Sequence, residues 1–214
     1  MRVSELSRSS GVPVATIKYY LREGLLARGA TTSPNQARYD SSHLRRLRLI
    51  RALVEVGGLP IAVVKEVLGA VDDPDTGLHG VLGRTVYAIT GTGGAEADSD
   101  VTDAAEADVR AITAHTGWRV SEKAPALAGA RSVLARMHEL GHAPGEDTLR
   151  LWAEAADRAA DGDLRAVAHR EADAGREGAA ETALVGTVLG DALLAALRRI
   201  AQESHSAARY RSDC

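Results

Sequence analysis

The chain contains no phenylalanine, a single cysteine and few aromatic residues of any kind. Five tyrosines and two tryptophans make up the whole aromatic content of its 214 residues. A hydrophobic core must therefore be built from Leu, Val, Ile and Ala, which favours packed helices. Because the only cysteine is Cys214, neither an internal disulfide nor a metal site of several thiolates is available.

Long apolar runs are also missing from the sequence. No run approaches the roughly 18 residues that a membrane-spanning helix requires, and the first residues are polar, unlike a signal peptide. We therefore expect a cytoplasmic protein with one or two domains and no membrane partner.

Charge is distributed unevenly along the chain. Residues 1–70 contain 11 Lys and Arg against 5 Asp and Glu, whereas residues 71–214 contain 15 against 24. The first part thus carries a net charge of +6 and the second a net charge of −9. Such asymmetry is typical of a nucleic-acid-binding module joined to an acidic body, and it predicts DNA contact at the basic end only.

Residues 12–24 predict a short helix, with Pro13 at its first position and Gly24 just past its end. At 100° per residue, its aliphatic face consists of Val14, Ile17 and Leu21. The opposite face consists of Ala15, Lys18, Tyr19 and Arg22. Cations and tyrosine hydroxyls bind phosphates, and a small residue lets the backbone approach base edges. An ordinary amphipathic surface helix is the alternative.

The residues around this helix favour a winged helix-turn-helix. Ser4 is expected to cap a preceding helix, and Ser10-Gly11 to form the turn between the two. Residues 25–30 and 36–39 are candidate strands joined by the turn formers of residues 31–35. Packed beside the helices, this hairpin would be a wing; an irregular surface loop is the alternative.

Two further helices are predicted before residue 72. The first is capped by Asp40-Ser41-Ser42 and is stopped by Gly57-Gly58, and the second begins at Pro60. The first helix also carries four arginines with no carboxylate among them, which suggests an anionic neighbour. These are Arg45, Arg46, Arg48 and Arg51.

Together these motifs resemble the DNA-binding domain of the MerR family of transcriptional regulators. Residues 16–26 resemble the family's recognition helix, Arg38-Tyr39 match its first wing, and residues 57–61 lie where the family turns into its second-wing helix pair. The resemblance implies a homodimer that binds and distorts a pseudo-palindromic operator in double-stranded promoter DNA. It also implies RNA polymerase as a partner at the promoter and an effector that binds the C-terminal part.

The residues expected to contact DNA lie on the recognition helix, the wing and the two helices that follow. They are Ala15, Thr16, Lys18, Tyr19, Tyr20, Arg22, Arg38, Tyr39, Arg46 and Lys65. The first three would approach base edges or adjacent phosphates, and the others would hold the DNA backbone. We expect no enzymatic activity and no cofactor.

The chain departs from the family after residue 71. A connecting helix over residues 78–90 and a flexible acidic linker over residues 91–100 replace the family's long coiled-coil helix, so another helix would form the dimer interface. We therefore expect three parts: a DNA-binding domain (1–71), a connection (72–101) and an all-α effector-binding and dimerisation domain (102–214). The overall fold class is mainly α.

Five helices are predicted in the C-terminal part, separated by Gly117, Gly141 and Gly162 among other residues. Their ranges are 102–115, 124–140, 146–160, 164–173 and 179–209. The last helix carries a broad apolar surface, which would serve as the core of this part, as a subunit interface, or as both.

Tyr87, Trp118 and Trp152 are the candidate effector-binding residues. An apolar or aromatic ligand would use such side chains, although core packing explains the tryptophans as well.

Residues 138–142, His-Glu-Leu-Gly-His, match the H-E-x-x-H zinc motif. That motif needs a continuous helix, whereas Gly141 and Pro144 predict a helix end near Leu140. Two other functions remain as alternatives: an adaptor whose helical body binds another protein, and a zinc hydrolase that uses His138, Glu139 and His142.

Overall fold

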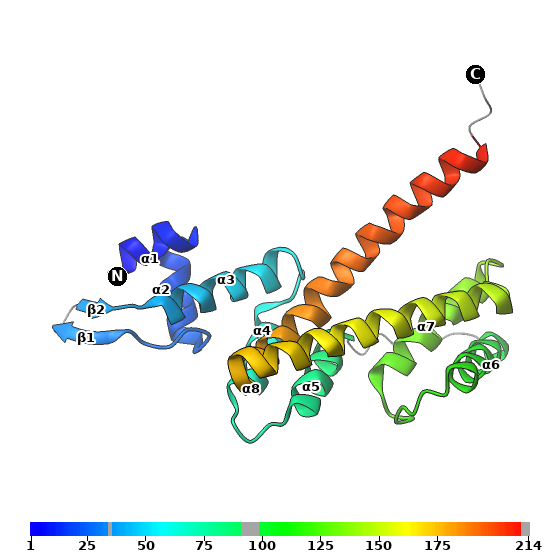
Figure 1. Ribbon diagram of the computed structural model, residues 1–214, viewed down its shortest axis with the longest axis horizontal. Helices are drawn as coiled ribbons and strands as arrows, with labels where there is room; N and C mark the ends of the chain where they lie inside the picture. The colour runs from blue at the N-terminus through cyan, green and yellow to red at the C-terminus, as the bar shows by residue number, and fades with distance from the viewer. Residues whose placement is uncertain (34–35, 91–98, 211–214) are drawn as a thin grey trace. The chain divides into compact units, whose positions relative to one another are not determined.

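The structure is a computed structural model that describes residues 1–33, 36–90 and 99–210. Within these residues the chain forms eight α-helices and one antiparallel hairpin, which confirms the mainly α fold class (Figure 1). The elements are α1 (Val3–Ser10), α2 (Val14–Glu23), β1 (Ala30–Ser33), β2 (Gln36–Arg38), α3 (Ser41–Glu55), α4 (Ile61–Asp72), α5 (Leu78–Thr90), α6 (Ser99–Thr116), α7 (Pro125–Glu139) and α8 (Glu146–Tyr210).

The chain divides into two compact units. The first unit comprises Met1–Asp73 together with the chain from Leu184 onward, and the second comprises Pro74–Ala183. The division therefore differs from the expected one, because the end of the last helix belongs with the N-terminal elements. The linker predicted over residues 91–100 lies mostly outside the described residues.

The first unit begins with a helix-turn-helix. Gly11 ends α1 with φ of 72° and Gly24 ends α2 with φ of 75°, so both take the left-handed conformation that favours glycine. Ser4 does not cap α1, because the helix already begins at Val3. Instead Glu5 Oε2 accepts a hydrogen bond from the Arg2 backbone N–H at 2.7 Å, which lowers the pKa of Glu5.

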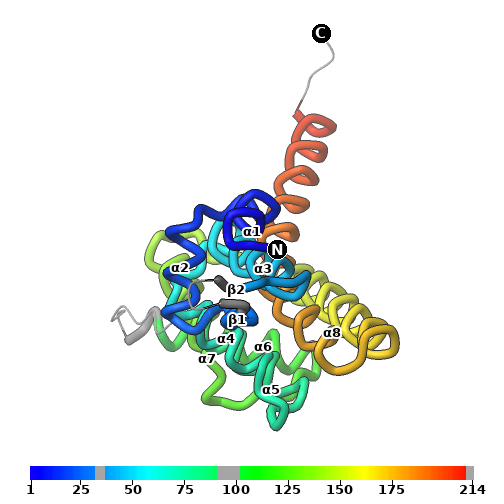
Figure 2. The backbone as a smooth tube through the Cα atoms, turned by 90° about the vertical axis from the view of Figure 1, so that its left-hand side faces the viewer, coloured from blue at the N-terminus to red at the C-terminus, as the bar shows by residue number. Residues whose placement is uncertain are grey.

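The hairpin predicted as a wing is present, but its first strand begins later than expected. β1 covers Ala30–Ser33 rather than residues 25–30, and Ala30 pairs with Arg38. Leu25 and Leu26 are buried ahead of the strand, because they pack in the core rather than pair with β2. In Figures 1 and 2 the hairpin lies close to α1, α2 and α3.

α3 and α4 begin and end close to the predicted positions. Asp40 caps α3 by accepting hydrogen bonds from the backbone N–H groups of Ser42 and His43, at 2.9 and 3.3 Å. Gly57 follows α3 and lies so close to α8 that a Cβ there would collide with Val188. This glycine therefore allows the part of α8 around Val188 to lie close to the end of α3 within the first unit.

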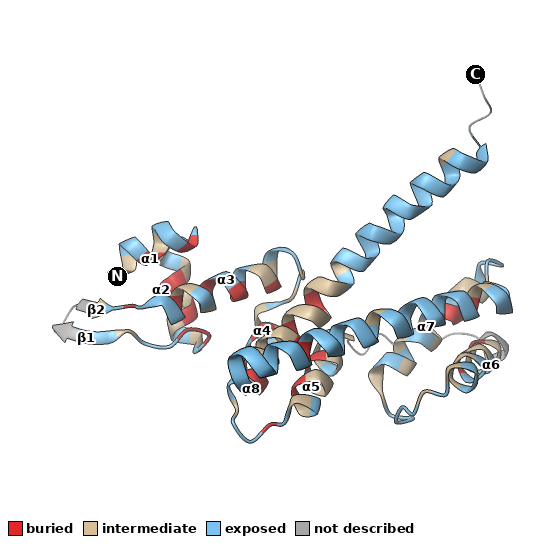
Figure 3. Ribbon diagram, viewed as in Figure 1, coloured by how far each residue is buried: buried red, intermediate tan, exposed pale blue. Residues whose placement is uncertain are grey.

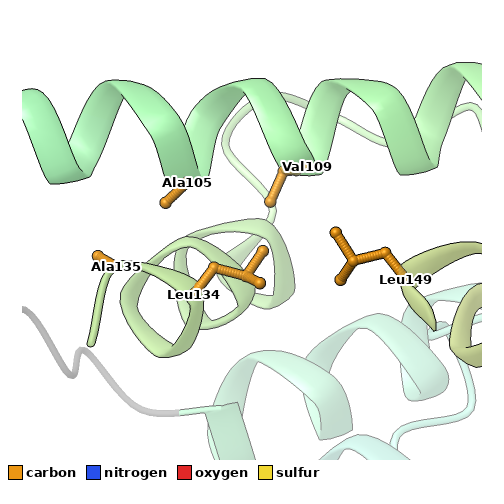
Figure 4. Close-up of a cluster of buried hydrophobic side chains, with 5 residues drawn as sticks. All are labelled: Ala105, Val109, Leu134, Ala135 and Leu149. Atoms are coloured by element: carbon orange, nitrogen blue, oxygen red, sulfur yellow. The ribbon is translucent and has the colours of Figure 1, made fainter. Parts of the chain in front are cut away.

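The second unit is built from α5, α6, α7 and most of α8. One core cluster joins α6, α7 and α8 through Ala105, Val109, Leu134, Ala135 and Leu149 (Figure 4). A second cluster joins α5 to α8 through Val167, Ala179 and Ala183, with Leu78 and Leu82 packed against them. The first cluster also forms the floor of a cavity.

α8 spans three predicted helices and contains one of the two expected breaks between them. Gly162, expected to separate the first two, lies inside the helix, whereas Gly175, with φ of 66° and ψ of −169°, forms a kink between residues 173 and 179, where a break is expected. A glycine at an exposed position within a helix lowers the stability of that helix by only about 1 kcal/mol relative to alanine. Gly162 alone therefore does not end the helix. α8 also contains an 18-residue window of mean hydropathy 1.5, which by length and composition alone could cross a membrane.

Candidate nucleic-acid interface

The recognition helix α2 has one buried and one exposed face. Ile17 is completely buried, whereas Ala15, Lys18 and Arg22 are exposed. Thr16 and Tyr19 are partly exposed on the same helix. α2 thus offers two cations, a hydroxyl and a small residue on its accessible side, as its periodicity predicts.

Two tyrosines of the expected contact set are buried. Tyr20 is 7% exposed, and burial raises the pKa of its hydroxyl. Tyr39 is 8% exposed and packs edge-on against His43, with ring centroids 5.1 Å apart. Both rings therefore belong to the core that supports α2 and the wing, and we remove them from the contact set.

Arg46 is partly buried and its guanidinium is already bonded within the protein. Its Nε donates to the Leu25 carbonyl at 3.0 Å, and its guanidinium forms a bidentate pair with the carboxylate of Asp72. The side chain consequently ties α3 to the end of α2 and to the end of α4. Its interaction with a phosphate, expected from the sequence, would break this pair.

Other cations of the first unit are exposed. Arg38 lies at the end of β2 and Lys65 on α4, and neither forms an ion pair with another described residue. The same holds for Arg45 and Arg48 on α3. These two arginines are absent from the expected contact set, although a search for carboxylates at i ± 4 would have separated them from Arg51, which pairs with Glu55.

The comparisons with known proteins agree with this geometry. The family model described as MerR HTH family regulatory protein matches residues 1–71. The solved structure of SCO5550 from Streptomyces coelicolor A3(2), a candidate transcriptional regulator, is 36% identical, covers 100% of both chains and gives a TM-score of 0.73. The chain belongs to the MerR family of transcriptional regulators.

Two curated relatives match a part of this MerR-family chain. They are nodulation protein NolA of Bradyrhizobium elkanii and of Bradyrhizobium sp. (strain NC92), each 39% identical over 56 residues. The match spans 26% of this chain, and 26% and 24% of the two relatives. The matched segment therefore spans only about a quarter of the length of each relative.

The H-E-x-x-H motif of this regulator does not form a zincin helix. α7 ends at Glu139, and Gly141 has φ of 70°, so His138 and His142 do not share one helical face. His138 Nε2 instead lies 2.8 Å from Asp108 Oδ2 on α6. Among the described residues, no group of three His, Cys, Asp or Glu is arranged to hold a metal ion.

A cavity of about 500 Å³ lies in the second unit, and Val109, Leu134 and Leu149 of the cluster in Figure 4 are part of its lining. Trp118 and Trp152 both line it, so the structure brings together two of the three candidate effector residues. Tyr87 does not line it; its hydroxyl is 3.4 Å from the Lys123 carbonyl oxygen.

The last part of α8 carries bulky aliphatic side chains that are largely exposed (Figure 3). Leu193, Leu197 and Ile200 are 60%, 51% and 63% exposed, and they follow one another at helical spacings of four and three. Leu184 and Val188, earlier in the same helix, are buried. Within α8, Leu184 and Val188 thus belong to the core, and the aliphatic residues from Leu193 onward form an exposed apolar stripe.

Proposed function

We propose that this chain is a cytoplasmic, homodimeric transcriptional regulator that binds a pseudo-palindromic promoter operator, acts on RNA polymerase there, and senses a small molecule through its second unit. The observation that carries the proposal is the exposed cationic face of α2, supported from behind by the buried Ile17. In a helix-turn-helix protein this face enters the major groove.

The proposed DNA contacts come from α2, the wing and α4. They are Ala15, Thr16, Lys18, Tyr19, Arg22, Arg38 and Lys65. Arg45 and Arg48 are added as phosphate contacts because they are exposed and have no carboxylate partner among the described residues. The second unit, Pro74–Ala183, is acidic, so DNA contact is restricted to the first unit.

The proposed subunit interface is the apolar stripe of α8. A two-fold interface uses the same surface on both subunits, and a stripe of leucine and isoleucine at spacings of three and four is suited to packing against its own copy. α5 is too short, at 13 residues, to form the family's long coiled coil.

DNA binding is tested with duplexes selected in vitro from a random library and then titrated at several salt concentrations. Removing one phosphate-binding side chain should reduce the slope of log affinity against log salt by about one. We expect this reduction for Lys18→Ala and for Arg38→Ala, and no change for Arg165→Ala, an exposed arginine of the second unit. Unchanged slopes in the first two variants would refute the contact assignment.

The interface is tested by light scattering of the full chain. Leu197→Asp should convert the dimer to a monomer, because it places a charge within the stripe. Leu164→Asp, which changes an equally exposed leucine elsewhere in α8, should leave the dimer intact. A dimer that survives Leu197→Asp would place the interface elsewhere.

A further inference from the structure

The cavity of the second unit has a closed apolar floor and an exposed apolar rim. Leu134 and Leu149 in the floor are 6% and 7% exposed. Val133, Val120 and Trp152 at the rim are 61%, 45% and 41% exposed. A folded protein normally covers side chains of this size, so the hollow holds apolar surface that is available to another molecule.

The polar atoms of the cavity wall already have partners in the protein. The Thr113 hydroxyl donates to the carbonyl oxygen of Val109 at 3.0 Å, within its own helix. The Trp118 indole N–H donates to Asp157 Oδ1 at 2.7 Å. No charged side chain belongs to the described lining. A molecule that enters would therefore meet hydrocarbon and aromatic surface.

An adjoining hollow, which shares Trp118 and other lining residues with the cavity, contains acidic and basic side chains in equal number. Glu106 forms ion pairs with both Arg110 and Arg131, which line that hollow together with Glu122. A charged ligand group would have to compete with these existing pairs. Since burial of an unpaired charge in an apolar site is costly, the cavity selects against ions of either sign.

The volume favours a small molecule over a protein segment. About 500 Å³ lies within the range of about 300–1,000 Å³ that is typical of small-molecule sites, which are concave and mostly apolar. We propose that this cavity binds an uncharged, apolar small molecule in contact with Trp118 and Trp152. This assignment deepens the sensing role proposed above and rests on it for its regulatory purpose.

The proposal is tested with two dyes that differ only by a sulfonate. N-phenyl-1-naphthylamine is uncharged, and 8-anilino-1-naphthalenesulfonate has the same ring system with one negative charge. With the full chain, we expect the neutral dye to bind at one site per chain and at least tenfold more tightly than the sulfonate. Because the only two tryptophans of the chain line the cavity, their emission should fall as the neutral dye binds.

A matched pair of variants locates the binding. Val133→Asp places a carboxylate at the cavity rim, and Leu140→Asp places one at a residue outside the lining that is similarly exposed, at 66%. Both changes lie on the surface, so both variants should fold, which thermal unfolding by circular dichroism verifies. We expect at least a tenfold loss of neutral-dye affinity for Val133→Asp and no loss for Leu140→Asp.

The outcomes separate this proposal from the proposed function. Equal affinity of the two dyes, or equal affinity of the two variants, overturns the ligand assignment. The same preparations are titrated with the selected duplex: if Lys18-dependent DNA binding persists while the neutral dye fails to bind, only the ligand assignment falls. If the dye binds as expected and DNA does not, the cavity assignment stands and the DNA-binding proposal falls.

Discussion

The helix-turn-helix of the first unit and the cavity region of the second unit differ in how completely they cover their apolar side chains. In the first unit the centres of α1, α2 and α3 are sealed, since Leu6, Ile17 and Ile50 are all 0% exposed. In the second unit Leu134 and Leu149 are covered, but Val133 and Trp152 are exposed on the same cavity. The difference suggests that the helix-turn-helix is packed for rigidity, whereas the cavity region keeps apolar surface for binding.

Rigidity suits a helix that must match the spacing of a DNA groove. A recognition helix reads bases only when its side chains keep a fixed register, which a tightly packed supporting core provides. A ligand cavity, in contrast, requires that packing be incomplete in the absence of the ligand. Substitutions in the two units should therefore have unequal effects on stability.

The largest effect is expected from a cavity created in the sealed core. Ile50→Ala should lower the free energy of unfolding by about 2–5 kcal/mol, because the surrounding helices cannot fill the space. Leu134→Ala should cost less, near the lower end of that range at about 2 kcal/mol, because its side chain already borders an open cavity. Urea denaturation followed by circular dichroism measures both, and equal losses would remove the contrast between the units.

The next largest effect on stability is expected at Gly57, where Val188 of α8 approaches closely. Gly57→Ala should destabilise the protein by about 1–3 kcal/mol, because the new methyl group would overlap Val188 and the Leu53 carbonyl oxygen. As a control, Gly162→Ala adds a methyl group that meets nothing within 4 Å and should stabilise α8 by about 1 kcal/mol. A neutral result for Gly57→Ala in thermal unfolding would contradict this close packing.

Arg46 distinguishes a structural cation from a DNA contact. Arg46→Ala should lower the free energy of unfolding by about 1 kcal/mol, since it leaves the Leu25 carbonyl and Asp72 without their donor. The salt slope of DNA binding should stay unchanged, in contrast to Lys18→Ala. A slope reduced by one would return Arg46 to the contact set.

The smallest effect concerns the cap of α3 and depends on pH. Hydrogen bonds from Ser42 and His43 hold the pKa of Asp40 well below its ordinary value of 3.8. The carboxylate therefore stabilises the fold above that ordinary value, and its contribution disappears as the pH falls through the lower, folded pKa. Asp40→Ala should lower Tm at pH 7 but much less near pH 2, whereas Asp40→Asn, which retains a cap, should lower Tm less at pH 7.

Local features of the fold could be predicted from the sequence, whereas contacts between distant residues could not. Gly11 and Gly24 end their helices as expected, because a residue with φ near 70° strongly favours glycine. Of the two breaks predicted within α8, the one at Gly162 is absent, whereas the one between residues 173 and 179 is present at Gly175. Which glycine breaks a helix depends on tertiary packing that local propensity does not contain.

The candidate site shows the same limit. The exposure of Lys18 opposite the buried Ile17 follows from helical periodicity alone. The pairing of Arg46 with Asp72 joins residues 26 positions apart, and no local pattern indicates it. Trp118 and Trp152 are candidates by residue type, but only the fold shows that they line one cavity.

α8 supplies the buried residues Leu184 and Val188 to the first unit. A single cut in the chain therefore cannot separate the two units. A fragment that stops after α4, although it would contain every residue matched by the family model, would lack the side chain that fills the space beside Gly57. Such a fragment would expose a strip of its own interior and tend to aggregate. We therefore expect a stable fragment of the DNA-binding part to require the segment of α8 that begins at Leu184.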